Sequence, residues 1–356
     1  APKDSTMGLP LSEQTLPEVL KKVDYKTKAI GKWHLGAHKS LVPERRGFDE
    51  FYGFIIGGHR YFPDDLTLND LTEARRQMDG YITKIYDNGK RINTSKYLTE
   101  ELSDNAVKFV DDNSENPFFL YLSYNAPHTP LQATEKDLAR NMHIEEENRR
   151  TYAAMVTSMD DGIGLILDKL EEKKISDNTI VIFFSDNGGV EWYNFSDNGE
   201  LRGIKGDFFE GGIRVPFVMQ WPDLLPAGLT YDNPIIALDI FATAASVANA
   251  EQYIKSDIDG VNLIPYILGQ KDDLPHDYLY WQNRDKDIDV IRGERYKYLR
   301  MGDEEFIFDL KNDISEKNNL IDTFKNIYDE YKFKFKEWEK DMIDPVFLDL
   351  GSGKEY

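Results

Sequence analysis

The stretch TIVIFFSDNGG, residues 179–189, joins a run of apolar residues to a turn of small and polar ones. The apolar part has the length and composition of a strand that is buried on both faces, as in a parallel sheet covered by helices. The polar part predicts a turn directly after the strand. Because ligands of open α/β sheets gather at the carboxyl ends of the strands, Asp186 and Asn187 are candidate functional residues.

Three other segments look like buried strands, and helical segments alternate with them. The further predicted strands cover residues 27–30, 118–124 and 215–221. Helices are predicted over residues 99–110, 146–173 and 237–248. This alternation predicts an α/β fold with a central, mostly parallel sheet and helices on both faces. Residues 40–95, rich in Gly, Asp, Asn and Tyr, are predicted to form long surface loops.

The pattern changes after about residue 270. Short alternating apolar runs predict antiparallel strands near residues 278–281, 289–292, 296–299 and 305–308, and a charged helix is predicted over 323–342. We therefore expect an α/β catalytic domain over residues 1–268 and a C-terminal α+β subdomain with a terminal helix over 269–356.

Composition excludes several classes of protein. The 356 residues include 64 acidic and 43 basic side chains, and the net charge of −21 argues against affinity for nucleic acid. An anionic substrate must then be held by a local group of cations, because the overall field repels it. No apolar run approaches the length of a membrane span. The absence of cysteine excludes disulfides and thiolate sites in these residues.

Reactive side chains follow the predicted strands at one edge of the sheet. Lys32 and His34 follow the strand at 27–30, and His128 follows the strand at 118–124. Lys205 lies shortly before the strand at 215–221. We expect these groups to meet Asp186 and Asn187 in one cleft, with His128 within about 15 Å of Asp186 so that proton donor and metal can straddle one ester.

The residue types indicate a reaction class. Oxygen ligands from Asp186 and Asn187 favour Ca²⁺ or Mg²⁺, although calcium needs about six or more ligands and the others must come from elsewhere. Two lysines beside such an ion can hold a tetrahedral oxyanion, sulfate or phosphate. A histidine such as His128 can protonate a departing alcohol oxygen. Together they predict hydrolysis of an ester of an inorganic acid.

Several motifs resemble those of the formylglycine-dependent type I sulfatases, most closely the bacterial polysaccharide sulfatases. They are GKWHLG (31–36), APHTPL (126–131), SDNGG (185–189) and GIKGDFFEGGIRVP (203–216), followed by DGVNL (259–263), RGERYKYLR (292–300) and IFDLKNDISEKNNL (307–320). The resemblance covers almost the whole chain. It implies the alkaline-phosphatase-like sulfatase fold and removal of O-sulfate from a sulfated polysaccharide or oligosaccharide. It also implies a periplasmic or extracellular location and a place beside other modules of a larger polypeptide.

The resemblance also implies a role for each motif residue. Lys32 would contact the sulfate and the nucleophile, and Lys205 would hold a sulfate oxygen. His34 would hydrogen-bond the hydroxyl of hydrated formylglycine and help to regenerate the aldehyde, and His128 would be the general acid. The pair that follows the strand at 179–184, Asp186 and Asn187, would bind calcium.

The sequence departs from the family in one respect. Family members carry two adjacent Asp metal ligands on their first strand, followed by a Cys/Ser-x-Pro-x-Arg motif whose first residue becomes formylglycine; neither is found here. We therefore expect the nucleophile to lie outside this chain, which alone should be inactive and bind calcium weakly or not at all. We also expect an exposed sheet edge or groove beside the strand that ends at Lys32.

Two other functions stay open. An alkaline-phosphatase-like phosphoester hydrolase would need a pair of zinc sites, and the chain has only six His. A catalytically dead module that binds sulfated glycans would explain the missing motif but gives no use for His128. His59 and Arg60 are weaker candidates, suited either to contact with a substrate sulfate or carboxylate or to a solvated turn.

Overall fold

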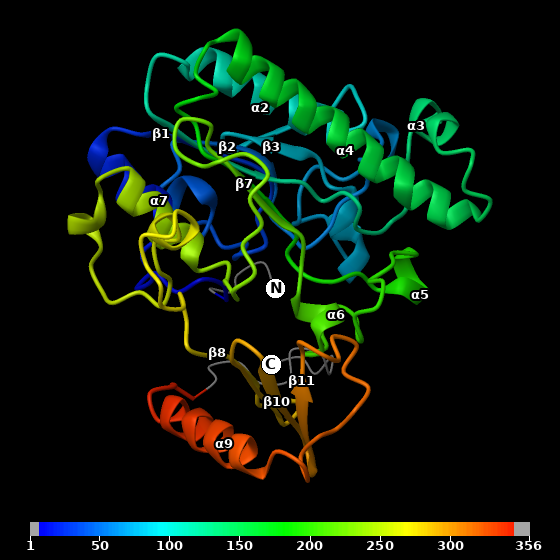
Figure 1. Ribbon diagram of the computed structural model, residues 1–356. Helices are drawn as coiled ribbons and strands as arrows, with labels where there is room; N and C mark the ends of the chain where they lie inside the picture. Colours follow the sequence, from blue (N-terminus) through cyan, green and yellow to red (C-terminus); the bar gives the residue numbers. More distant parts are fainter. Residues whose placement is uncertain (1–6, 345–356) are drawn as a thin grey trace.

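The computed structural model describes residues 7–344 (Figure 1). Its strands are β1 (Lys26–Lys32), β2 (Glu50–Phe54), β3 (Ile85–Asp87), β4 (Lys90–Ile92), β5 (Phe118–Ser123), β6 (Val181–Phe184), β7 (Phe217–Gln220), β8 (Leu279–Asn283), β9 (Ile288–Arg292), β10 (Tyr296–Met301) and β11 (Glu304–Asp309). Its α-helices are α1 (Leu16–Leu20), α2 (Leu98–Asn113), α3 (Glu135–Arg140), α4 (Glu147–Glu172), α5 (Glu191–Asn194), α6 (Glu210–Ile213), α7 (Asp239–Val247), α8 (Ile264–Ile267) and α9 (Lys325–Glu339).

The main sheet has five strands in the order β4-β3-β2-β1-β5. β1 pairs in parallel with both β2 and β5, whereas β2–β3 and β3–β4 are antiparallel. The predicted α/β fold is confirmed, with a mixed rather than a mostly parallel sheet. The difference arises in residues 40–95, which contain β2, β3 and β4 where only loops were predicted.

Helices cover both faces of this sheet. Ile30 of β1 packs in one cluster with Leu102 of α2 and Met155 of α4, together with Leu122 of β5. On the opposite face, Phe119 packs against the cluster that joins α1 to α7. Successive strand residues point to opposite faces, so neighbouring side chains of one strand enter two different cores. In Figure 1, α2 and α4 run along one side of the sheet and α7 lies on the other.

β6 and β7 form a separate antiparallel pair, in which Phe184 lies opposite Phe217. Among the described residues, β5 pairs only with β1, and β6 pairs only with β7, so each keeps one edge without a partner strand. Tyr121 of β5 and Phe183 of β6 are accordingly exposed. The predicted open edge beside β1 is therefore wrong, because β1 is an inner strand of the sheet and is paired on both sides, with β2 and with β5.

The C-terminal part is a four-stranded antiparallel sheet in the order β11-β10-β9-β8. Tyr331 and Phe335 of α9 pack on Ile291 and Tyr298 of this sheet. The expected C-terminal antiparallel sheet is confirmed, whereas the domain boundary at residue 268 stays a prediction.

The two parts of the chain are joined around α6. Phe209 packs among apolar residues of the C-terminal sheet. The ammonium group of Lys297, fully buried in β10, lies 3.1 Å from the Glu210 carboxylate and 2.8 Å from that of Glu316. Glu316 also accepts a hydrogen bond from the backbone N–H of Glu210. The C-terminal sheet thus holds the segment that follows Lys205.

None of the helices between residues 7 and 344 has both the length and the apolar character needed to cross a bilayer.

Candidate active site

Lys32 and His34 are placed by continuation of the β1–β2 pairing. Lys32 is the last residue of β1, and the next two N–H groups, of Trp33 and His34, donate to the carbonyl oxygens of Phe54 and Ile55 at 2.9 and 3.0 Å. His34 has a φ of 57°, the left-handed conformation that ordinary residues rarely adopt. The turn at His34 takes the chain out of the sheet at the residue that carries the imidazole.

The His34 ring rests on Gly57. A Cβ atom at position 57 would lie 2.7 Å from Cε1 and 2.8 Å from Nε2 of His34, so any side chain there would displace the ring. A Cβ atom at the next residue, Gly58, would likewise lie 2.5 Å from the ring of Tyr81. Two adjacent glycines therefore bring a histidine and a tyrosine against one stretch of backbone.

His128 lies in the loop after β5 and is fixed by three hydrogen bonds. Its N–H donates to the Asn125 carbonyl oxygen at 2.7 Å, and its own carbonyl oxygen accepts from the Tyr61 hydroxyl at 2.8 Å. Its Nδ1 lies 2.7 Å from the Thr129 carbonyl oxygen. Because a carbonyl oxygen can only accept, Nδ1 carries the hydrogen, and Nε2 is the atom that can take up or release a proton.

Backbone contacts bring the Asp186–Asn187 turn to the Lys205 segment. The N–H of Gly188 donates to the Gly212 carbonyl oxygen at 3.0 Å, and the N–H of Lys205 donates to that of Gly189 at 3.4 Å. Gly188 is therefore needed because the two segments meet backbone to backbone at this residue.

Electrostatic effects tie the candidate residues together. Burial lowers the pKa of Lys32, Asp186 raises it and Lys205 lowers it further. Burial also lowers the pKa of His128, and the positive charges of Lys205 and Lys32 lower it further. The Thr129 carbonyl oxygen and the negative charge of Asp186 act in the opposite direction and raise it.

His34 belongs to the same group. Burial lowers its pKa, and the positive charges of Lys32 and Lys205 lower it further, with a smaller effect from His128. The mutual effects of these charges indicate that two ammonium groups, two imidazoles and one carboxylate lie near one another, whereas their meeting in one cleft stays a prediction.

The oxygen ligands do not make a calcium site by themselves. The Asn187 amide nitrogen donates to the Gly188 carbonyl oxygen at 2.9 Å, and this bond does not use the side-chain oxygen of Asn187. Two such residues fall short of the about six to eight oxygens that calcium takes. In residues 7–344 no three His, Asp or Glu side chains are grouped as a metal site would require. The described residues therefore do not fit a complete calcium site.

The other histidines lie elsewhere. His59 is fully buried against Phe54, with Nδ1 2.9 Å from the Arg60 carbonyl oxygen and Nε2 2.8 Å from that of Thr83. Both predictions for His59, contact with a substrate and a solvated turn, are therefore wrong. Arg60, in contrast, has a half-exposed side chain.

Three aromatic residues near the group were not singled out from the sequence. Tyr81 lies against Gly58, and Trp192 and Tyr193 are exposed on α5, a few residues after Asp186. The sequence feature that could have pointed to Trp192 and Tyr193 was their position as two adjacent large aromatic residues in an otherwise polar loop.

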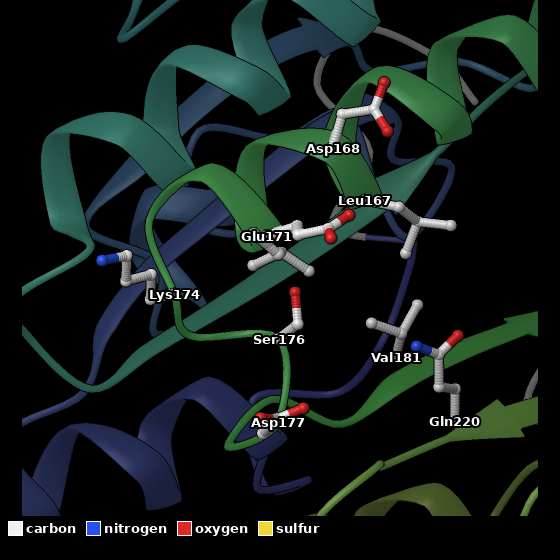
Figure 2. A pocket seen from close by; sticks show the side chains of 9 residues that line it. Leu167, Asp168, Glu171, Lys174, Ser176, Asp177, Val181 and Gln220 are labelled. Carbon is white, nitrogen blue, oxygen red and sulfur yellow. The ribbon is translucent and has the colours of Figure 1, made fainter.

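A cavity of about 470 Å³ opens at the opposite end of the β6–β7 pair (Figure 2). Val181, Gln220 and the end of α4 line it, with Asp168, Glu171 and Asp177 at its rim. None of the candidate site residues reaches it, and its acidic lining suits no sulfate ester.

The sequence profile of the sulfatase family matches residues 2–250, and that of the C-terminal region of N-sulphoglucosamine sulphohydrolase matches residues 205–341. The chain is 31% identical to the uncharacterized sulfatase YdeN of Escherichia coli (strain K12) over 78% of its own length and 51% of the relative. It is 32% identical to the N-acetylgalactosamine-6-sulfatase of Canis lupus familiaris, over 85% of its own length and 55% of the relative. The chain spans about half the length of these curated relatives.

Solved structures are similar over nearly the whole chain. The complex of Ps i-CgsB with k-i-k-neocarrahexaose superposes with a TM-score of 0.89 at 35% identity, over 98% of this chain and 79% of that one. The PsFucS1 sulfatase from Pseudoalteromonas sp., at 23% identity and a TM-score of 0.76, covers 92% of this chain and 73% of its own and supports the fold alone. On the profile match over residues 2–250 and the identity to curated sulfatases, this chain belongs to the sulfatase family.

Proposed function

We propose that the chain binds an O-sulfate ester of a sulfated carbohydrate and protonates the leaving sugar oxygen during its hydrolysis. The observation that carries the proposal is the grouping of Lys32, Lys205 and His128, whose charges act on one another. In a chain with a net charge of −21, such a local concentration of cations is what an anionic ligand requires.

Each residue of this chain has a distinct part in the proposed reaction. Lys32 and Lys205 hold the non-bridging sulfate oxygens by charge, which stabilises the negative charge of the transition state. When the bond between sulfur and the sugar oxygen breaks, that oxygen takes the Nε2 proton of His128. The lowered pKa of His128 makes its imidazolium form a stronger acid toward the leaving oxygen, and, as for His34, it also reduces the fraction of protonated ring near neutral pH.

His34 has a different part. Its lowered pKa favours the neutral imidazole near neutral pH, so it can accept a proton. We propose that it acts on the nucleophile, as the family pattern implies.

We further propose that the nucleophile is a formylglycine outside these 356 residues. The sequence contains no Cys, and none of its Ser residues begins a Ser-x-Pro-x-Arg motif. A formylglycine would supply the attacking oxygen. We propose Ca²⁺ as the metal, with Asp186 and Asn187 as two of its ligands and further oxygens from outside this chain. A periplasmic or extracellular location is proposed on the family alone.

A carrageenan-type oligosaccharide is the first substrate to test. The similar protein Ps i-CgsB was solved with k-i-k-neocarrahexaose, and it matches 98% of this chain. A phosphoester hydrolase is the rival within the same fold class. Metal analysis separates the two, since calcium supports the sulfatase and a pair of zinc ions supports the phosphatase.

Calorimetric titration of the chain with sodium sulfate tests the binding half of the proposal. We expect saturable sulfate binding that weakens about tenfold in Lys205→Ala, because one ammonium at a partly buried oxyanion is worth about 1.4 kcal/mol. Lys325→Ala is the matched control, since Lys325 lies on the exposed face of α9. Equal sulfate affinity in the Lys205→Ala and control variants would contradict the proposed oxyanion site.

A further inference from the structure

A second cavity, of about 220 Å³, lies directly beside His128. Its lining includes Thr129 and Pro130, the two residues that follow His128, and Tyr81 and Tyr193 form other parts of the wall. Its space corresponds to about seven water molecules at about 30 Å³ each, which is comparable to a single hexopyranose unit.

Two residues of the cavity wall, Thr129 and Tyr81, connect it to the surroundings of the candidate histidines. Thr129 accepts the Nδ1–H hydrogen bond of His128 and also lines the cavity. Tyr81 lines it as well and rests on Gly58, next to the Gly57 that supports the His34 ring. A ligand that fills the cavity is therefore in position to extend into the group of charged residues.

Tyr193, which lines the cavity, and its neighbour Trp192 are exposed and do not pack in a core. Trp192 is 75% exposed and Tyr193 54% exposed, although their rings lie 5.7 Å apart and contact each other. Large aromatic side chains bury 150–250 Å² when they pack in a protein interior, so two adjacent exposed ones leave a large apolar surface for a ligand. The C–H faces of a sugar ring are apolar and suit such a surface, while its hydroxyl groups point outward from the ring edge.

The short helix that carries these aromatics is held to the Asp186–Asn187 turn. Asn198 donates its backbone N–H to the Glu191 carboxylate at 3.1 Å. Its side-chain oxygen accepts from the N–H of Gly189 at 2.9 Å. The Arg149 guanidinium donates to the Phe195 carbonyl oxygen at 2.8 Å at the end of α5. The aromatic surface is therefore positioned before a ligand binds, which reduces the entropy lost on binding.

Polar groups in the lining complement a sulfated sugar. Arg60 contributes a half-exposed guanidinium, whose Nη1 is 3.5 Å from the Asp65 carboxylate, long enough to leave its donors open to a ligand. The Asp79 carboxylate, held by the N–H groups of Arg75 and Arg76, can accept hydrogen bonds from sugar hydroxyls. One cation and one acceptor beside aromatic faces suit a carbohydrate better than a purely apolar ligand.

We propose that this cavity is a sugar-binding subsite for the residue next to the sulfated one, with Tyr193 and Trp192 as its stacking surface and Arg60 facing an anionic substituent. The inference rests on the proposed function, because it assumes that the sulfate lies at Lys32 and Lys205. It adds the determinant that selects an oligosaccharide over a small sulfate ester.

Calorimetric titrations with k-i-k-neocarrahexaose and with sodium sulfate test the subsite. In Tyr193→Ala and Trp192→Ala we expect the affinity for the hexasaccharide to fall about tenfold, as truncation of a binding aromatic typically does, and the affinity for inorganic sulfate to stay within about twofold. Phe333→Ala is the matched control, since Phe333 is an exposed aromatic residue on the distant α9. It should change neither affinity. Arg60→Met should weaken hexasaccharide binding and reduce its dependence on salt.

The outcomes separate the two proposals. Wild-type hexasaccharide affinity in Tyr193→Ala and Trp192→Ala would overturn the subsite and leave the oxyanion site standing. The subsite would also be overturned if the wild-type chain bound sulfate but not the hexasaccharide. The same holds if the aromatic variants lost affinity for both ligands to the same extent. Failure of the wild-type chain to bind either ligand would overturn the proposed function and the subsite with it.

Discussion

A Cβ atom on Gly188 would lie 1.7 Å from the carbonyl oxygen of Gly211. Gly188 belongs to the turn that carries Asp186 and Asn187, and Gly211 belongs to the helix after Lys205. This close backbone approach joins two motifs, at residues 185–189 and 203–216, that are separate in the sequence. Any side chain at position 188 must push the turn that contains Gly188 away from the helix that contains Gly211.

Gly188→Ala should therefore weaken sulfate binding and destabilise the fold by about 1–3 kcal/mol, since the added methyl group meets backbone that cannot turn away. Sulfate titration and urea unfolding measure the two effects. Gly164→Ala is the control, because a Cβ at this position of α4 meets nothing within 4 Å. It should stabilise the chain by about 0.5–1 kcal/mol through helix propensity. If the two variants behave alike, the contact does not constrain the site.

Lys297→Met should destabilise the chain by about 3–5 kcal/mol, because it removes the buried cation between two buried carboxylates and leaves Glu210 only a longer ion pair with Arg214. Glu210 and Glu316 are both almost inaccessible to solvent, so water cannot replace the lost partner. Urea unfolding measures the loss. Lys325→Met, which breaks only an exposed pair with Asp329, should change stability by less than about 0.5 kcal/mol. A loss in Lys297→Met no larger than in this control would show that the buried ions do not hold α6 to the C-terminal sheet.

His59 should make stability depend on pH between about 6.5 and 4. Burial lowers its pKa to about 4, although its contacts with the carbonyl oxygens of Arg60 and Thr83 favour the protonated ring. The contribution is complete above pH 6.5. As the pH falls, the unfolded chain takes up a proton that the folded chain does not, so the free energy of unfolding drops by about 3 kcal/mol by pH 4.

Urea unfolding at the two pH values checks this. The difference between pH 6.5 and pH 4 should be smaller by about 3 kcal/mol in His59→Gln than in the wild type. His143→Gln, at an exposed position, should keep the wild-type difference. An NMR titration of the His59 ring gives the pKa directly, and a value near 6.5 would contradict the account even if the variant failed to fold.

Much of the fold was predictable because continuous apolar runs identify buried strands. The run at 179–184 is a strand, as expected, over Val181–Phe184, but the prediction that it is buried on both faces is wrong, because Phe183 and Phe184 are exposed. Its partner was not predictable, because an apolar run says that both faces are covered but not which strand lies alongside. β2 was missed altogether, although Phe51, Tyr52 and Phe54 are buried, because it stands among the polar residues of a long loop region.

The candidate site was predictable to the extent that it follows strand ends. Lys32, His128 and Asp186 meet because the loops after their strands open toward the same place. The aromatic surface of Trp192 and Tyr193 was not predictable, since the sequence cannot distinguish an exposed aromatic residue from one that fills a core. The individual roles of the site residues stay predictions.

The most direct test of the account is the release of inorganic sulfate from k-i-k-neocarrahexaose. It is measured with the 356-residue chain and with the same chain joined to a family segment that carries the formylglycine motif, produced in a host that makes formylglycine. We predict no release by the chain alone, release by the joined form, and a loss of about 10²–10⁴-fold in its His128→Ala variant. Turnover by the chain alone would contradict an external nucleophile, and unchanged turnover in His128→Ala would contradict the assignment of His128 as the general acid.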